Sequence, residues 1–72
     1  MAVSYKKLFK LLIDRNMNGA DLRRTANISP NTLTKLYKHD YVALEVLDRI
    51  CTVLDVDYSD IIEHVKVGDI QE

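Results

Sequence analysis

The sequence predicts an all-α fold in which five short helices pack around a single core. Three observations support this prediction. Apolar residues recur every three or four positions along most of the chain, which is the period of an amphipathic helix. Helix-start signals stand at Asn18 and Ser29, so two short helices follow each other closely. The 72 residues include only two glycines and one proline, so few positions would interrupt a helix.

Length and composition are those of one globular domain. The chain is 47% hydrophobic and 29% charged, and a chain of this size buries only about 60% of the surface that its unfolded form exposes. We therefore expect a single domain over residues 1–72, with a helical core at 4–66 and a tail at 67–72. The apolar runs are too short for a signal peptide or a membrane span, which favours a cytoplasmic protein without membrane contact.

The first helix is expected to begin at Ser4, whose hydroxyl can cap it, and to end near Asn16. Residues 1–3 before it are expected to be frayed. One side of this helix is apolar and the other is rich in lysine. The lysines suit either a solvated face or a contact with phosphate.

Residues 18–28 predict a second short helix followed by a tight turn. Asn18 is a good N-cap residue, and Asp21 stands three positions later, where its carboxylate can bond back to the backbone. Asn27 tolerates the left-handed backbone conformation that a turn needs, and Ile28 can anchor the turn in the core. With another helix directly after it, this spacing is that of a helix-turn-helix.

The third helix is expected to start sharply after Ser29, because Pro30 suits the first helical position. Its inward face is apolar and consists of Leu33, Leu36 and Tyr37. Its outward face is polar, contains no acid, and consists of Asn31, Thr34, Lys35 and Lys38. A solvated helix usually mixes both charge signs, so this face suits a partner rich in acceptors and negative charge, such as DNA.

A fourth helix is expected over Leu44–Leu54. One apolar stripe runs along it and consists of Leu44, Leu47, Ile50, Cys51 and Leu54. The only cysteine, Cys51, falls on that stripe, so we interpret it as a small core residue and not as a nucleophile. Val46 and Val53 lie about 100° off the stripe by the helical period. These two valines need another partner, either the final helix or a second subunit.

A fifth helix is expected from Asp60 to about Val65, capped by Ser59. Two apolar residues, Val67 and Ile70, follow in the tail. The tail can lie against its own domain or take part in a dimer contact.

Charge is unevenly distributed along the chain, although the net charge is only −1. Residues 1–40 contain eight basic and three acidic residues, whereas residues 41–72 contain two basic and eight acidic residues. Because attraction to phosphate is screened beyond about 8 Å at physiological salt, the local charge of a docking surface matters more than the total. The basic half can therefore bind DNA while the acidic half faces away.

Together, Asn18, Leu22, Asn27, Ile28 and Ser29 stand at the offsets typical of one family of helix-turn-helix proteins, and the block LEVLDRICTVLDVD follows at residues 44–57. In these features the chain, from about residue 5 to residue 65, resembles the Cro and lambda-repressor-like (XRE-type) family of bacterial and phage regulators. The resemblance implies sequence-specific binding of double-stranded DNA by a transcriptional regulator, a repressor more readily than an activator.

The chemistry of the side chains predicts separate roles on DNA. Asn31 and Lys35 are expected to read base edges, because an amide pairs with adenine and an ammonium group with guanine, and Thr32 and Thr34 are further base-reading candidates. The phosphate candidates are Asn18, Arg24, Ser29, Lys38 and, by the family resemblance, Lys6. We expect a homodimer on a palindromic operator with half-sites about 34 Å apart.

The sequence contains no recognisable catalytic constellation, phosphate loop or metal-ligand spacing, so we expect no enzyme activity and no cofactor. An alternative function of another class stays open. The domain could bind a protein through the same helices, or serve as the antitoxin of a toxin–antitoxin pair whose acidic half holds a basic toxin.

Overall fold

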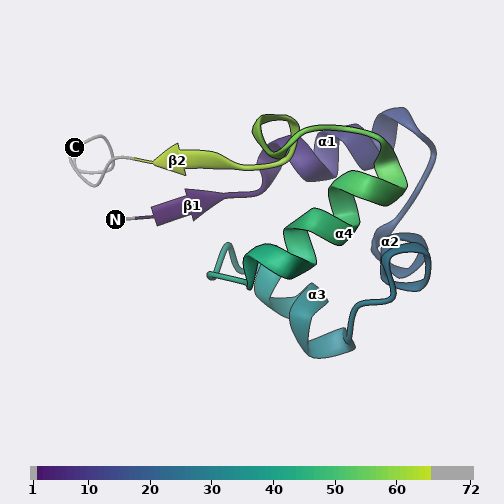
Figure 1. The fold of residues 1–72 in the computed structure, drawn as a ribbon, viewed down its shortest axis with the longest axis horizontal. Coiled ribbons are helices and arrows are strands. Elements are labelled where there is room, and N and C mark those ends of the chain that lie inside the picture. Colours follow the sequence, from purple (N-terminus) through teal and green to yellow (C-terminus); the bar gives the residue numbers. More distant parts are fainter. Residues whose placement is uncertain (1, 66–72) are drawn as a thin grey trace.

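The computed structural model describes residues 2–65, which fold into four α-helices and a small two-stranded sheet (Figure 1). In chain order the elements are β1 (Ala2–Ser4), α1 (Lys6–Asp14), α2 (Gly19–Ala26), α3 (Pro30–Tyr37), α4 (Leu44–Leu54), the 3-10 turn η1 (Tyr58–Asp60) and β2 (Glu63–Val65). Figure 1 shows α4 crossing the middle of the domain, with α1 on one side of it and α3 on the other. The sheet of β1 and β2 extends from one end of the domain.

The predicted all-α fold with a fifth helix was wrong at both ends of the chain. Asp57, and not Ser59, caps the short η1 turn, and the chain then becomes extended. Residues 63–65 pair antiparallel with residues 2–4, in the register Ala2↔Val65, so the expected fraying of residues 2 and 3 was also wrong. A helix of six residues rich in β-branched side chains is not stable by itself. Pairing with a distant strand instead gives hydrogen-bond partners to the backbone N–H and C=O groups of both segments.

The first helix is shorter than predicted at both ends. Ser4 is the last residue of β1 and is buried, and its Oγ accepts a hydrogen bond from the N–H of Lys6 at 3.3 Å, but the N-cap position itself belongs to Tyr5. The helix ends at Asp14, and Asn16 already has a left-handed φ of 58°. The tail residues Val67 and Ile70 lie outside the described part of the chain.

Each α-helix contributes a fully buried aliphatic side chain to one core, and so does the segment after η1. These side chains are Leu8, Leu22, Leu36, Ile50, Leu54 and Ile61. The prediction for Cys51 is confirmed, because it is buried in the same cluster. Of the two valines outside the stripe of α4, Val46 packs against the domain's own core, while Val53 stays 38% exposed. Leu44, expected on the apolar stripe, is instead 64% exposed at the first turn of α4.

A side chain of α4 holds the turn between α2 and α3. Asn27 has the left-handed backbone conformation predicted for it, with φ 55° and ψ 52°. Its carbonyl oxygen accepts a hydrogen bond of 3.0 Å from Nη1 of Arg49. The half-buried guanidinium thus links the middle of the domain to the turn that sets the angle between the two helices.

Replacing Arg49 with Ala should lower the free energy of unfolding by about 1 kcal/mol, because the Asn27 carbonyl loses a charged donor. Urea or thermal unfolding measures this loss. Arg15→Ala is the matched control, since Arg15 is exposed and its side chain has no partner within residues 2–65; the control should change stability by less than about 0.5 kcal/mol. Equal losses in the two variants would show that Arg49 does not hold the turn.

Candidate nucleic-acid interface

The predicted start of α2 is confirmed in atomic detail. Oδ1 of Asn18 accepts a hydrogen bond from the N–H of Asp21 at 2.9 Å, and Oδ2 of Asp21 accepts one from the N–H of Asn18 at 3.2 Å. This reciprocal capping box uses the amide oxygen of Asn18 but leaves its amide N–H groups free to donate. Ile28, in the turn that follows α2, is buried as expected.

The start of α3 is confirmed as well, with Ser29 at the N-cap and Pro30 at the first helical position. Oγ of Ser29 accepts a hydrogen bond from the N–H of Thr32 at 3.1 Å and lies 2.9 Å from the Thr32 hydroxyl oxygen. Because one hydroxyl of this pair donates to the other, a single hydroxyl proton remains for a ligand. The base-reading candidate Thr32 and the phosphate candidate Ser29 can therefore offer only one hydroxyl proton between them.

The inward face of α3 is only partly as predicted. Leu36 is fully buried and Leu33 is half-buried, but Tyr37 is 55% exposed. The Tyr37 ring does not enter the core and instead stacks on Phe9 of α1, with ring centroids 5.0 Å apart and planes within 8°. The last turn of α3 is thus fixed by the buried Leu36 and by the stack of Tyr37 on Phe9.

The outward face of α3 is exposed and largely without internal partners. Within residues 2–65, the side chains of Asn31, Lys35 and Lys38 make no hydrogen bond or ion pair. Thr34 differs, because its hydroxyl donates to the carbonyl oxygen of Pro30 at 3.1 Å. Thr34 can therefore offer a ligand its methyl group or an acceptor, while the amide and the two ammonium groups beside it are free donors.

The remaining phosphate candidates lie on α2 and α1. Arg24 forms an exposed ion pair with Asp21 one turn earlier on α2. Such a surface pair stabilises the fold little, so the guanidinium can exchange Asp21 for a phosphate at small cost. Lys6 is exposed at the start of α1 and makes no side-chain hydrogen bond within residues 2–65.

Tyr5 attaches the start of α1 to the loop that follows α3, a contact that the sequence did not reveal. Its backbone N–H donates to Nδ1 of His39 at 3.0 Å, its hydroxyl donates to the carbonyl oxygen of Asp40 at 2.7 Å, and its ring stacks on the imidazole with centroids 6.0 Å apart. Burial raises the pKa of the Tyr5 phenol, which keeps it protonated as a donor. Lys6 is the next residue, so its position is fixed relative to the end of α3.

His39 begins the loop that follows α3 and takes part in its structure. The residue is exposed, but it has a left-handed φ of 59° and its Nδ1 acts as the acceptor for Tyr5. This hydrogen bond requires the neutral imidazole with its proton on Nε2. The ring therefore connects the loop that follows α3 to the start of α1.

A match to a family model identifies the chain. The model describes the Cro/C1-type HTH DNA-binding domain and matches residues 7–66. The chain belongs to this family. Its fold is similar to that in the crystal structure of the transcriptional regulator VanUg (Form II), with a TM-score of 0.87, 48% sequence identity, and coverage of 89% of this chain and 85% of that chain. No curated protein matches the chain.

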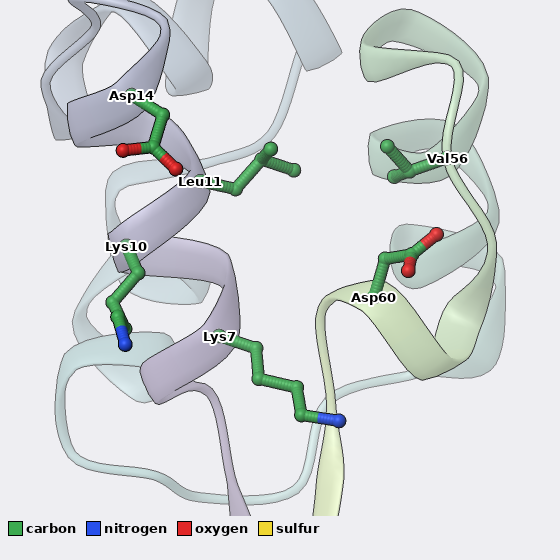
Figure 2. A pocket seen from close by; sticks show the side chains of 6 residues that line it. All are labelled: Lys7, Lys10, Leu11, Asp14, Val56 and Asp60. Atoms are coloured by element: carbon green, nitrogen blue, oxygen red, sulfur yellow. The ribbon is translucent and has the colours of Figure 1, made fainter.

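One surface cavity of this Cro/C1-type domain lies between α1 and the segment around η1, away from α3. It has a volume of about 410 Å³ and is lined by Lys7, Lys10, Leu11, Asp14, Val56 and Asp60. Figure 2 shows Leu11 and Val56 facing each other across it, while Nζ of Lys7 donates to the carbonyl oxygen of Ser59 at 3.2 Å. Its lining mixes both charge signs, whereas the outward face of α3 carries lysines and no acid.

Neither a metal nor a thiol site accompanies the helix-turn-helix in the described residues. Within residues 2–65, no three His, Cys, Asp or Glu side chains are grouped so that they could hold a metal ion. Burial raises the pKa of the Cys51 thiol, as expected for a cysteine that packs as an apolar residue. The helices of this part of the chain are too short and too polar to cross a bilayer.

Proposed function

We propose that this Cro/C1-type domain is a sequence-specific transcriptional regulator that inserts α3 into the major groove of double-stranded DNA. One observation carries the proposal: the exposed face of α3 holds an amide and two ammonium groups that have no partner within residues 2–65, and it holds no carboxylate. A helix of this kind fits the major groove, where base edges offer acceptors between two rows of phosphates.

The first turns of α3 would read the bases. Asn31 can pair its amide with the acceptor and donor of adenine, and Lys35 can donate to the two acceptors of guanine. Thr34 would contact the methyl group of thymine, because its hydroxyl proton is already donated to Pro30. Thr32 would donate its hydroxyl proton to a base when the Ser29 hydroxyl is the donor of the hydrogen bond between them.

Phosphate contacts would position the domain without specifying sequence. Ser29 and Asn18 stand at the starts of α3 and α2, where helix dipoles favour an anion. Lys38 extends the basic face beyond the last turn of α3, while Arg24 and Lys6 lie on α2 and α1. The phosphates of one backbone segment would thus meet donors from three helices.

The domain would act as a repressor, because a protein that occupies an operator can block transcription without contacting another protein. The family resemblance supports the same choice. Expression of the chain beside a reporter gene driven by the bound sequence should lower reporter output; a rise would assign the opposite sign of regulation.

Two lysines on α3 should respond differently to substitution. Lys35→Ala is expected to cost about 1–3 kcal/mol on a duplex selected by the native protein and to relax selectivity at one base pair. Lys38→Ala should weaken binding to all duplexes about equally and lower the salt slope by about one. Fluorescence anisotropy titrations at several salt concentrations measure both effects.

Lys7→Ala is the matched control for these titrations. It removes the same charge from α1, where Nζ of Lys7 donates to the carbonyl oxygen of Ser59 in η1 and not toward α3. The control should bind as the native protein does. If all three variants lost affinity alike, the assignment of base and phosphate roles would be wrong.

We also propose that the domain binds as a homodimer, because one α3 helix covers too few base pairs to define an operator. Two copies related by a two-fold axis would read half-sites about 34 Å apart. Sedimentation with and without a selected palindromic duplex should show two protein chains per duplex. A single chain per duplex would contradict the proposal, and a stoichiometric second protein that displaces the duplex would favour the protein-binding alternative.

A further inference from the structure

The position of Tyr37 at the end of α3 is unusual for so large a side chain on the inward side of a helix. More than half of it is exposed, and its ring lies flat against Phe9 instead of entering the core. Its hydroxyl reaches the first residue of α2. A Cβ atom built on Gly19 would overlap the Tyr37 hydroxyl oxygen and would lie 3.1 Å from Cζ of the same ring.

The presence of glycine at position 19 is explained by this contact and not by the backbone conformation at that position. No glycine of the described residues has a positive φ, so any residue could adopt the conformation of Gly19. Glycine is also a poor helix former. The structure therefore indicates that the missing side chain makes room for the Tyr37 hydroxyl.

The Tyr37 hydroxyl contributes no hydrogen bond to the described part of the domain. Within residues 2–65 it makes no hydrogen bond, although a tyrosine hydroxyl that packs against protein usually finds a partner. The stack on Phe9 holds the ring, so the hydroxyl is a free donor on a fixed support. A fixed donor loses little conformational freedom when it binds a ligand.

The place of this hydroxyl joins two parts of the proposed DNA surface. By the helical period, Tyr37 lies about 60° around α3 from Thr34, at the border of the outward face. Its hydroxyl lies beside Gly19, directly after the capping residue Asn18. It therefore stands at the seam between α3 and the start of α2.

We propose that Tyr37 contacts DNA, with its hydroxyl donating a hydrogen bond to a phosphodiester oxygen of the backbone segment that crosses this seam. The inference rests on the proposed function and adds a residue to it. Gly19 supports the contact by leaving space for the ring. The contact positions the domain and does not read sequence, because the hydroxyl meets the backbone and not a base edge.

Tyr37→Phe tests the contact, because it removes the hydroxyl and keeps the stack on Phe9. Affinity should fall about 3- to 10-fold, the value of one hydrogen bond, on both a duplex selected by the native protein and a scrambled duplex of equal length. The thermal unfolding midpoint should not change. The salt slope should also stay the same, since a neutral hydroxyl releases no counterion, whereas Lys38→Ala should lower it.

Two further variants sharpen the experiment. Tyr58→Phe removes a tyrosine hydroxyl from η1, on the side of the domain away from α3, and should bind as the native protein does. Gly19→Ala, which displaces the Tyr37 ring, should weaken binding at least as much as Tyr37→Phe.

The outcomes separate this inference from the function on which it rests. Native affinity in Tyr37→Phe, or a loss confined to the selected duplex, would overturn the phosphate contact while leaving the DNA-binding function intact. Failure of the native protein to bind any duplex in a salt-dependent manner would instead overturn the proposed function.

Discussion

The whole interface depends on how a helix of eight residues is held in place. An isolated helix of this length is not stable in water, so α3 must take its order from contacts with the rest of the domain. Ser29 caps its first turn, Leu36 is fully buried in the core, and the Tyr37 ring stacks on Phe9 at its end. Because these contacts all lie at the ends and on the inward side, the outward side keeps its polar groups free.

The contacts that fix α3 come from segments far apart in the chain. Arg49 of α4 holds the turn before the helix, and Tyr5 at the start of α1 holds the loop after it. Both ends of α3 are thus held by contacts on its inward side. A rigid support of this kind reduces the conformational entropy that DNA binding would otherwise cost.

The sequence predicted α2 and α3 but not the pairing of β1 with β2, and the difference has a physical reason. The limits of α2 and α3 depend on local signals, namely Asn18, Asn27 and the Ser29-Pro30 pair, and each of these was predicted correctly. The pairing of β1 with β2 joins strands of three residues about sixty positions apart, and strands so short leave no periodic pattern to detect. The last segment was therefore assigned to a helix.

Side-chain contacts between elements were equally hidden from the sequence. The spacing placed Tyr37 on the apolar face of α3 but could not show that Gly19 leaves space for its hydroxyl. Nor could it show that His39 accepts a hydrogen bond from a residue 34 positions earlier.

The most direct measurement of the central claim is a map of backbone amide chemical shifts for the ¹⁵N-labelled protein, recorded with and without a duplex selected from random DNA. If the outward face of α3 binds the major groove, the largest shifts should fall on residues 29–38 and on the start of α2. Shifts concentrated around the cavity between α1 and η1, with residues 29–38 unchanged, would contradict the account.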